Sequence, residues 1–304
     1  MSLIGAIEAG GTKFVLALAR ADGTILERTR LQTQHAEETL PHMADWFDAV
    51  SAKLGRIGAF GIASFGPIDI DPASPAYGTF TTTPKPGWSG ACYSEVLSRF
   101  DVPLAIDTDV NGAALGEQLA GAGQDKRTVA YTTVGTGIGT GVVSDGRALI
   151  GISHYESGHI RPARPAHDDS WPGNCSYHGD CLEGLCSGPA IEARWGHDLS
   201  QASDEQVALV ADYIAEFAMT LALLHMPDVM IFGGGVMKSP GLLDALREKT
   251  RARLAGYAAP YDRDLTDIIV PPGLGDDAGI TGAIQLGLNA LTTEPAAENG
   301  PDNA

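Results

Sequence analysis

The stretch "LIGAIEAGGTKFVLALARADGTIL", residues 3–26, decides the fold. An apolar run leads to a glycine turn at 10–12, a second apolar run follows, and Asp-Gly at 22–23 separates it from a third. Apolar runs bounded by such turns are typical of strands. The stretch therefore predicts a strand, a tight turn, a strand, a hairpin and a third strand.

The same plan returns at residues 128–151, "TVAYTTVGTGIGTGVVSDGRALIG". An apolar strand again leads to a glycine turn, a second strand, an Asp-Gly hairpin at 145–146 and a third strand. Two copies of one supersecondary unit predict two similar domains that face one another.

Helical patterns alternate with the strands, and they occupy residues of about 39–54, 203–226, 240–254 and 278–291. The second of these begins with Ser203 and Gln206, the spacing of a capping box. Strands that alternate with helices along a chain indicate the α/β class.

The glycine turns have the chemistry of phosphate sites. Glycine lets the backbone approach a ligand closely, and the amides of such a turn form a concavity for an anion. Thr12 and Thr136 would add hydroxyl donors, and Lys13 would add a cation for a terminal phosphate. The alternative is that the glycines only join antiparallel strands. The chain contains neither the P-loop motif nor the Rossmann G-x-G-x-x-G motif, so both of these enzyme classes are excluded.

A third glycine cluster, at 233–235, ends the apolar run "VMIF". Bare backbone at the end of a strand can accept a flat ring or a sugar, and the alternative is a plain turn from strand to helix. In "LAIDTDVNGAALGE", residues 104–117, the polar side chains Asp107, Asp109 and Asn111 end another strand. Ligands of α/β proteins bind at such strand ends. Each aspartate is a candidate for a helix cap or for a general base.

The segment "GNCSYHGDC", residues 173–181, brings Cys175, His178 and Cys181 close together in the sequence. The chain has only four cysteines in 304 residues and no signal peptide, which predicts a cytoplasmic protein with reduced thiols. A metal site or an accidental cluster in a loop then remains. Zinc in a structural site takes four ligands. His159 is the nearest candidate for the fourth, and His154 and His167 compete with it.

The remaining composition excludes several classes of partner. The net charge of −18 disfavours binding to nucleic acid. No stretch reaches the roughly 20 apolar residues of a membrane span, so no membrane partner is expected. Residues 292–304 are polar and small, which predicts a disordered tail. Cys186 lies outside the metal spacing and is predicted to be a small apolar residue.

Together these segments resemble the sugar kinases of the ROK family (repressor, open reading frame, kinase), a branch of the actin-like ATPases. The resemblance covers about residues 3–290 and depends on the order and number of its motifs. These are "EAGGTK" at 8–13, "FGPID" at 65–69, "DTDVNGAALGE" at 107–117, "GTGIGTG" at 135–141, "ESGHI" at 156–160, "CSYHGDCLE" at 175–183, "SGPA" at 187–190 and "FGGGVM" at 232–237.

The resemblance implies a two-domain, actin-like (ribonuclease H-like) α/β fold with the active site in the cleft between the domains. The domains would be residues 1–112 and 113–291, with the option that the helix at about 278–291 packs back on the first. The activity would be ATP-dependent phosphorylation of a hexose, with Mg²⁺ bound to the ATP, a structural Zn²⁺ and a homodimeric protein.

The resemblance also assigns residues. Asp109 stands in the position of the catalytic aspartate. The residues that would bind the sugar are Asn111, Glu156, His159 and Glu183. The residues that would bind ATP are Gly10, Gly11, Thr12, Lys13, Thr133, Gly135, Thr136, Gly137, Pro189, Gly233, Gly234, Gly235, Val236 and Met237. The residues that would bind zinc are His159, Cys175, His178 and Cys181.

The sugar is indicated by three segments that resemble the bacterial fructokinases of this family: "TPKPGW" at 83–88, the C-x2-H-x2-C loop and "SGPAIEARWG" at 187–196. They imply that fructose becomes fructose 6-phosphate, with a glucokinase or mannokinase as the alternative. A sugar-sensing repressor of the family is disfavoured, because the first hairpin starts at residue 3 and leaves no room for a helix-turn-helix. A sugar-binding module without transfer is disfavoured because Asp109 is present.

Overall fold

A computed structural model describes residues 2–83 and 85–292, and the chain divides into two compact units. Unit 1 contains the described residues up to Gly112 together with those from Ile280 onward, and unit 2 contains Ala113–Gly279. Thr292 is the last residue of a helix. The rest of the predicted tail, residues 293–304, lies outside the described residues.

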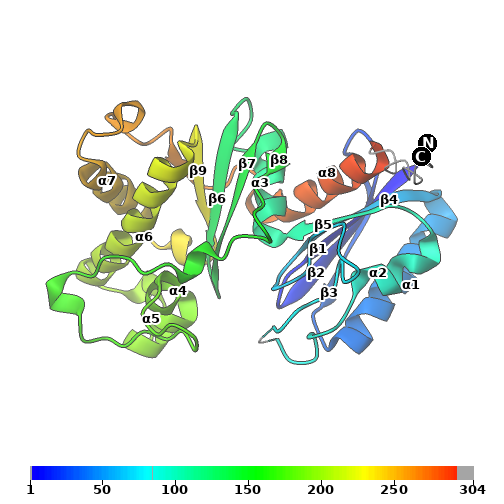
Figure 1. The fold of residues 1–304 in the computed structure, drawn as a ribbon, viewed down its shortest axis with the longest axis horizontal. Coiled ribbons are helices and arrows are strands. Elements are labelled where there is room, and N and C mark those ends of the chain that lie inside the picture. The colour runs from blue at the N-terminus through cyan, green and yellow to red at the C-terminus, as the bar shows by residue number, and fades with distance from the viewer. Residues whose placement is uncertain (1, 84, 293–304) are drawn as a thin grey trace, which may run out of the picture. The chain divides into compact units, whose positions relative to one another are not determined.

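The sheet of unit 1 is built from the first glycine hairpin. Its strands are β1 (Leu3–Ala9), β2 (Lys13–Ala19), β3 (Ile25–Gln32), β4 (Ile57–Ser64) and β5 (Leu104–Thr108), in the order β3-β2-β1-β4-β5 (Figure 1). The three consecutive strands β1, β2 and β3 pair antiparallel, whereas β4 and β5 extend the sheet in parallel from β1. The stretch that predicted three strands thus forms three adjacent strands.

Unit 2 repeats this topology. Its strands are β6 (Thr128–Val134), β7 (Ile138–Ser144), β8 (Arg147–Ala148), β9 (Val229–Gly233) and β10 (Ile269–Val270). The order β8-β7-β6-β9-β10 matches that of unit 1 strand for strand, with the same antiparallel and parallel pairs. The third strand has only 2 residues, whereas its counterpart β3 has 8. The α/β class and the actin-like plan are confirmed.

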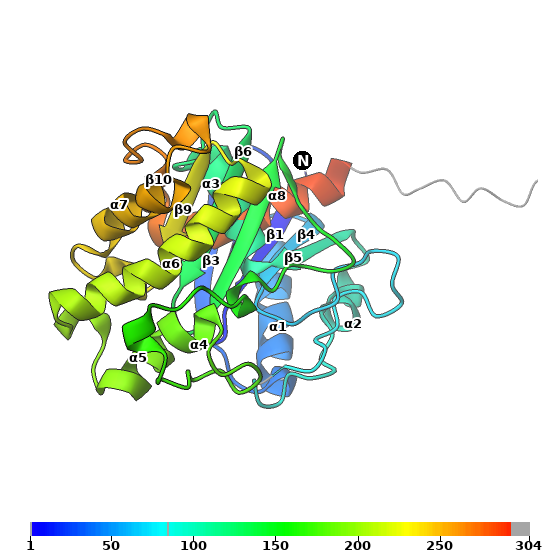
Figure 2. The ribbon, with the colours of Figure 1, turned by 60° about the vertical axis from the view of Figure 1, so that its left-hand side comes forward.

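Helices cover both faces of the sheet in unit 1: α1 (Ala36–Leu54) and α2 (Tyr93–Leu97) on one face and α8 (Ala278–Thr292) on the other (Figure 2). Apolar side chains at helical spacing, Leu40, Met43 and Phe47, place one face of α1 in the core. On the other face α8 contacts β4 almost backbone to backbone, since a Cβ on Gly61 would lie 1.9 Å from the carbonyl oxygen of Ala283. This contact places α8 in unit 1.

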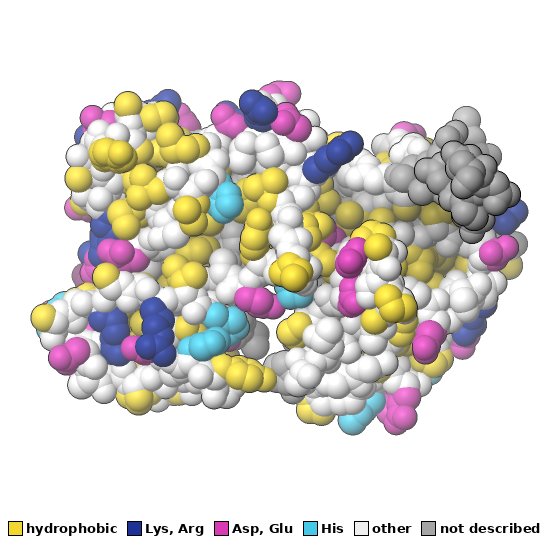
Figure 3. Space-filling view, viewed as in Figure 1, with side chains coloured by type: hydrophobic (Ala, Val, Ile, Leu, Met, Phe, Trp, Pro, Cys, Tyr) yellow, Lys and Arg dark blue, Asp and Glu magenta, His cyan; other side chains and the backbone are white. Residues whose placement is uncertain are grey.

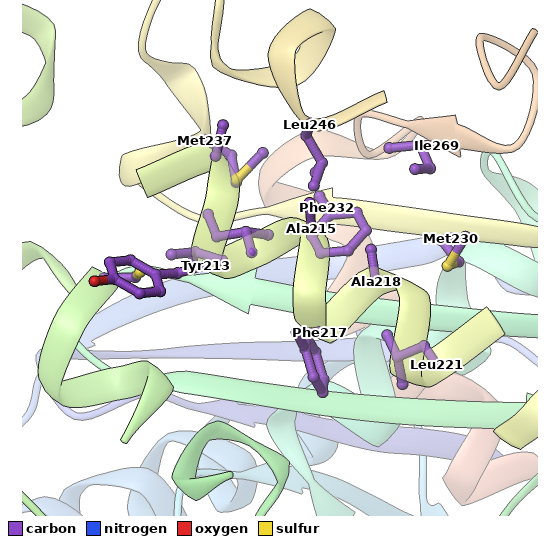
Figure 4. Close-up of a cluster of buried hydrophobic side chains, with 14 of the residues drawn as sticks. Tyr213, Ala215, Phe217, Ala218, Leu221, Met230, Phe232, Met237, Leu246 and Ile269 are labelled. Carbon is purple, nitrogen blue, oxygen red and sulfur yellow. The ribbon is translucent and has the colours of Figure 1, made fainter. Parts of the chain in front are cut away.

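The helices of unit 2 enclose its core. They are the second part of α3 (Asp109–Ala120), then α4 (Leu182–Cys186), α5 (Gly188–Trp195), α6 (Asp204–His225) and α7 (Leu242–Leu254). The capping box at the start of α6 is present, because Ser203 and Gln206 each accept from the backbone of the other. Phe217 and Leu221 of α6 and Phe232 of β9 belong to one buried cluster (Figure 4).

By length and composition alone, α6 could cross a membrane, which the sequence analysis did not anticipate. Its surroundings are those of a core helix. Asp212 and Glu216 lie in the middle of α6 and pair with Lys249 and Arg253 of α7 at 2.7–3.1 Å. The opposite side of α6 is buried in the core of unit 2. The ion pairs on one side of α6 and the burial of the other side show that its apolar residues pack in the protein core.

Candidate active site

The first glycine turn, in unit 1, presents its backbone as an anion site. Gly10 N–H donates to the carbonyl of Lys13 at 2.9 Å, which closes the turn. Thr33 binds the turn from behind, with its hydroxyl on Gly10 O at 2.8 Å and its N–H on Thr12 O at 2.9 Å. Within the described residues, the N–H groups of Gly11 and Thr12 have no protein acceptor. A Cβ on Gly11 would meet nothing within 4 Å, so the turn is open to a ligand.

The second glycine turn, in unit 2, is held by the start of two helices. Gly135 donates to the carbonyl of Gly137 at 2.9 Å and accepts from Gly188 N–H of α5 at 2.7 Å. The next residue, Ile138, donates its N–H to the carboxylate of Glu183 in α4 at 3.0 Å. The second glycine turn is therefore held by the segments around Glu183 and Gly188. The sequence analysis predicted sugar-binding and ATP-binding residues in these two segments.

A pocket of about 500 Å³ opens beside this turn in unit 2. Residues from four segments line it, among them Gly135, Thr136, Gly188, Ser200, Gly235, Val236 and Ser239. Four of the predicted ATP residues, Gly135, Thr136, Gly235 and Val236, thus share one cavity. The sequence analysis missed the other lining residues, which are Gly188, Ile191, Asp198, Leu199, Ser200, Lys238 and Ser239. The D-x-S turn, in which Ser200 N–H donates to Asp198 at 2.9 Å, was the available signal.

Other predicted ATP residues lie behind this lining or beside it. Gly234 has φ +94°, and a Cβ there would lie 2.3 Å from Val134 O, so the position requires glycine. Thr133 pairs with Gly233 inside the sheet. Met237 lies in the hydrophobic core rather than in the pocket (Figure 4). Gly234, Thr133 and Met237 therefore lie behind the residues that line the pocket. Pro189 lies in the first turn of α5, next to Gly188.

The two aspartates at the end of β5 in unit 1, Asp107 and Asp109, have different surroundings. The cap of α3 is Thr108, whose hydroxyl accepts from Asn111 N–H at 3.2 Å. Asp107 is 4 % exposed and accepts from the side chain of Asn111 at 2.6 Å and from Thr108 N–H at 2.7 Å. Asp109, the first residue of α3, is only half-buried. Asp107 therefore has a structural environment, whereas Asp109 is the accessible carboxylate.

The predicted sugar ligands of unit 2 gather around Ile138. Its N–H binds Glu183, and its carbonyl oxygen touches the "ESGHI" segment, where a Cβ on Gly158 would lie 1.9 Å away. His159 follows Gly158 in a short 3-10 helix. Glu156 precedes it, exposed, with its carboxylate 3.3 Å from His154 Nδ1. Ile138, which directly follows the second glycine turn, therefore contacts both Glu183 and the segment that contains Glu156 and His159.

His159, Cys175, His178 and Cys181 form a compact cluster whose ligand atoms all lie within 4.8 Å of one another. The Nδ1 atom of His159 is 3.8 Å from Cys175 Sγ and 3.5 Å from Cys181 Sγ. A tetrahedral zinc site with Zn–S near 2.3 Å and Zn–N near 2.0 Å has S···N edges of roughly 3.5 Å, so the cluster fits zinc. Figure 3 shows histidine side chains in cyan beside lysine or arginine side chains in dark blue, over the segment around α4. His154 and His167 are not part of the cluster.

The loop geometry explains how three ligands reach one point. Cys175 and Gly179 exchange two backbone hydrogen bonds at 3.2 and 2.9 Å, and φ of +65° at Gly179 permits the tight turn. Burial raises the pKa of Cys181 to about 11, so metal binding there has to displace a proton. All four cysteines lie in the described part of the chain and are free, and Cys186 is buried in the core.

A buried ionic network, which the sequence analysis did not find, supports the loop. Asp168 is 3 % exposed and accepts from Arg194 of α5 and Tyr213 of α6. Arg164 donates to the carbonyl of Asp168, and its guanidinium group lies 3.5 Å from the carboxylate of Asp180. In the sequence, Asp180 stands between two residues of the metal cluster, His178 and Cys181. Burial opposes ionisation of Asp168, but the hydrogen bonds and charges of Arg194 and its neighbours hold its pKa below the usual value.

Comparison with known proteins identifies the chain. The profile of the ROK family matches residues 4–290. The chain is 42 % identical to a fructokinase of Zymomonas mobilis, over 95 % of this chain and 97 % of that protein. It superposes on the ROK hexokinase of Thermus thermophilus with a TM-score of 0.77 and 28 % identity, over 94 % of this chain and 97 % of the other. A ROK family glucokinase of Streptomyces griseus, solved with glucose and AMPPNP, gives a TM-score of 0.70 and 25 % identity, over 95 % and 100 %. The chain therefore belongs to the ROK family.

Proposed function

We propose that the protein is an ATP-dependent fructokinase that transfers the γ-phosphoryl group of MgATP to the 6-hydroxyl of D-fructose. The observation that carries this proposal is the position of Ile138. It ends the turn that lines the 500 Å³ pocket, and it contacts both Glu183 and the "ESGHI" segment. A nucleotide site and a sugar site that share one backbone segment suit direct transfer between their ligands.

The chemistry requires few groups from the protein. The sugar oxygen attacks the γ-phosphorus, the bond from that phosphorus to the β,γ-bridging oxygen breaks, and ADP leaves with the bond electrons. Asp109 accepts the hydroxyl proton as the general base. Its half-buried position at the start of α3 leaves it accessible, and Thr108 supplies the helix cap in its place. Transfer of this kind depends chiefly on alignment and on neutralising phosphate charge.

Zinc has a positioning role in this proposal. The four residues His159, Cys175, His178 and Cys181 would hold zinc with two imidazoles and two thiolates, so the metal would supply structure rather than activate a water molecule. His159 faces the thiols through Nδ1. Its Nε2 then remains to hydrogen-bond a sugar hydroxyl, while Leu182 N–H, bonded to Ile160 O at 2.8 Å, ties the loop to the "ESGHI" segment.

The choice of fructose is supported by the identity of 42 % with a protein named fructokinase, against 25 % with the Streptomyces griseus glucokinase. An ATP-coupled assay across fructose, mannose, glucose, N-acetylmannosamine and allose tests it. We expect the highest kcat/KM for fructose. A higher value for glucose or mannose would overturn the choice of sugar and leave the kinase assignment in place. The homodimer and the cytoplasmic location remain predictions.

A further inference from the structure

Lys85 extends to the first glycine turn from a distant part of unit 1. Its ammonium nitrogen lies 2.5 Å from the carbonyl oxygen of Gly11, between the two residues whose amides form the open side of the turn. Lys85 is half-buried. Together with Lys13, at the start of β2, it is a second cation beside the same short stretch of backbone.

The loop that carries Lys85 is anchored on the core beneath this turn. Trp88 is fully buried, and its indole N–H donates to Gln34 O at 2.9 Å. The Trp88 ring lies 5.5 Å from the ring of Phe14, the residue that directly follows Lys13. Trp88 N–H also donates to Lys85 O at 3.3 Å. The same aromatic contact therefore fixes the position of the loop and of the strand that leaves the turn.

The contact with Gly11 uses only part of the capacity of the ammonium group. A lysine ammonium has three donors, and one of them suffices for a carbonyl oxygen. Thr33 already binds the carbonyls of Gly10 and Thr12, so with Lys85 on Gly11 O each of these three carbonyls has a donor. An ammonium group held at the edge of an anion site can contact the anion with its remaining donors.

We propose that Lys85 is a catalytic residue that contacts the phosphoryl group during transfer and stabilises its negative charge. This inference rests on the proposed function, because a kinase must place that group beside the first glycine turn. A preorganised cation aimed at charge that develops in the transition state accelerates transfer more than it strengthens binding of the sugar. The competing role is a purely structural tether between the loop and Gly11.

Three variants separate the two roles. Lys85→Arg keeps the charge, Lys85→Gln keeps a neutral donor for Gly11 O, and Lys85→Met keeps only the apolar stem. We expect Lys85→Met and Lys85→Gln to lower kcat about 10²-fold, the scale for loss of one such donor, with little change in the KM for fructose. Lys85→Arg should retain more activity than either. The exposed Lys53→Met is the matched control and should behave like the unaltered enzyme.

Activity in Lys85→Gln close to that of the unaltered enzyme would overturn the proposal and establish the tether. A second measurement does not depend on the sugar or on turnover: calorimetric binding of inorganic tripolyphosphate to the same four variants. We expect weaker binding in Lys85→Met and Lys85→Gln, and binding near the original in Lys85→Arg and Lys53→Met. Equal affinity in all four variants would contradict a phosphate contact. If the enzyme proved inactive on every hexose, the proposed function would fail, and this binding series would still decide the role of Lys85.

Discussion

The carboxylate of Glu183 accepts a hydrogen bond from the backbone N–H of Ile138, with 3.0 Å between Oε2 and N. Glu183 stands two residues after Cys181 of the His/Cys cluster, and Ile138 follows the turn that lines the 500 Å³ pocket of unit 2. The fit is close, since a Cβ on Gly137 would lie 2.9 Å from the same carboxylate oxygen. One side chain thus connects the metal loop to the turn.

Replacing Glu183 with alanine should raise the KM for fructose by about 10- to 100-fold, because a hydrogen bond to a charged group contributes about 1.5–3 kcal/mol. Steady-state kinetics with each substrate varied in turn measure this effect. Glu192→Ala, an exposed change on the neighbouring helix α5, is the control and should alter neither constant. An equal rise in the KM values for ATP and fructose would show that Glu183 acts only through the turn.

Replacing Asp109 with asparagine should lower kcat by at least about 10²-fold, the usual scale for loss of a general base. The amide keeps the shape of the side chain but cannot accept the hydroxyl proton, so sugar and ATP binding should change little. Rapid-quench or steady-state kinetics and calorimetric binding test the two parts. A near-normal kcat would remove Asp109 from this role.

The neighbouring Asp107→Asn should affect stability instead. Asp107 is buried, and its Oδ1 accepts from both the Asn111 side chain and the backbone of Thr108, so an amide can keep these two bonds but loses the charge that strengthens them. We expect a loss of about 1–3 kcal/mol in the free energy of unfolding, measured by urea denaturation. A loss of kcat with unchanged stability would assign the general base to Asp107.

Replacing Cys181 with serine should release the metal and raise the KM for fructose, while the KM for ATP changes little. The reason is that the cluster orients His159, whereas the first glycine turn lies in unit 1 and the second keeps its hydrogen bond between Gly135 O and Gly188 N–H. Elemental analysis of freshly purified protein should give one zinc per chain before the change. The buried Cys186→Ala is the matched control and should keep its zinc. A full zinc content in His159→Ala would show that the ligand set is wrong.

Replacing Asp168 with asparagine should destabilise the protein by about 3–5 kcal/mol at pH 7, because Arg194 then keeps its charge without its partner. The pKa of Asp168 is lowered in the folded protein. Its ionised form therefore stabilises the fold above the unfolded pKa of about 4, and this contribution is lost as the pH falls through the folded value. The difference between the two proteins should accordingly shrink below about pH 4.

Urea unfolding at a series of pH values measures this difference, with the exposed Asp169→Asn as the control. Comparing variants at each pH removes the effect of acid on the metal cluster, since both proteins contain it. A difference in unfolding free energy that stays constant down to pH 3 would contradict the assignment to an ionised Asp168.

The parts of the fold that depend on local pattern could be predicted from the sequence. The glycine turns and Asp-Gly hairpins specify antiparallel neighbours, and the capping box of Ser203 marks the start of α6. The return of α8 to unit 1 could not be derived locally. It depends on the contact between Gly61 and Ala283, residues far apart in the chain that show no pattern on their own.

The same limit applies to the site. Residues in motifs, such as Cys175 and His159, could be chosen because their type and spacing match a known chemistry. The choice between Asp107 and Asp109 needed geometry, since Thr108 between them turned out to be the cap. Asp168 lies in an irregular segment without periodicity, and its partners come from two other helices. Nothing in the sequence connects them.

The close contact between α8 and β4 has a consequence for the order of synthesis. The ribosome completes residues 1–112 early, yet the second face of their sheet stays uncovered until the last helix emerges. The alanines on that face, Ala6, Ala17 and Ala63, remain solvated throughout the translation of unit 2. Domains usually fold as they leave the ribosome, from the N-terminus onward. Here the domain that begins first can be completed only after the other has been made.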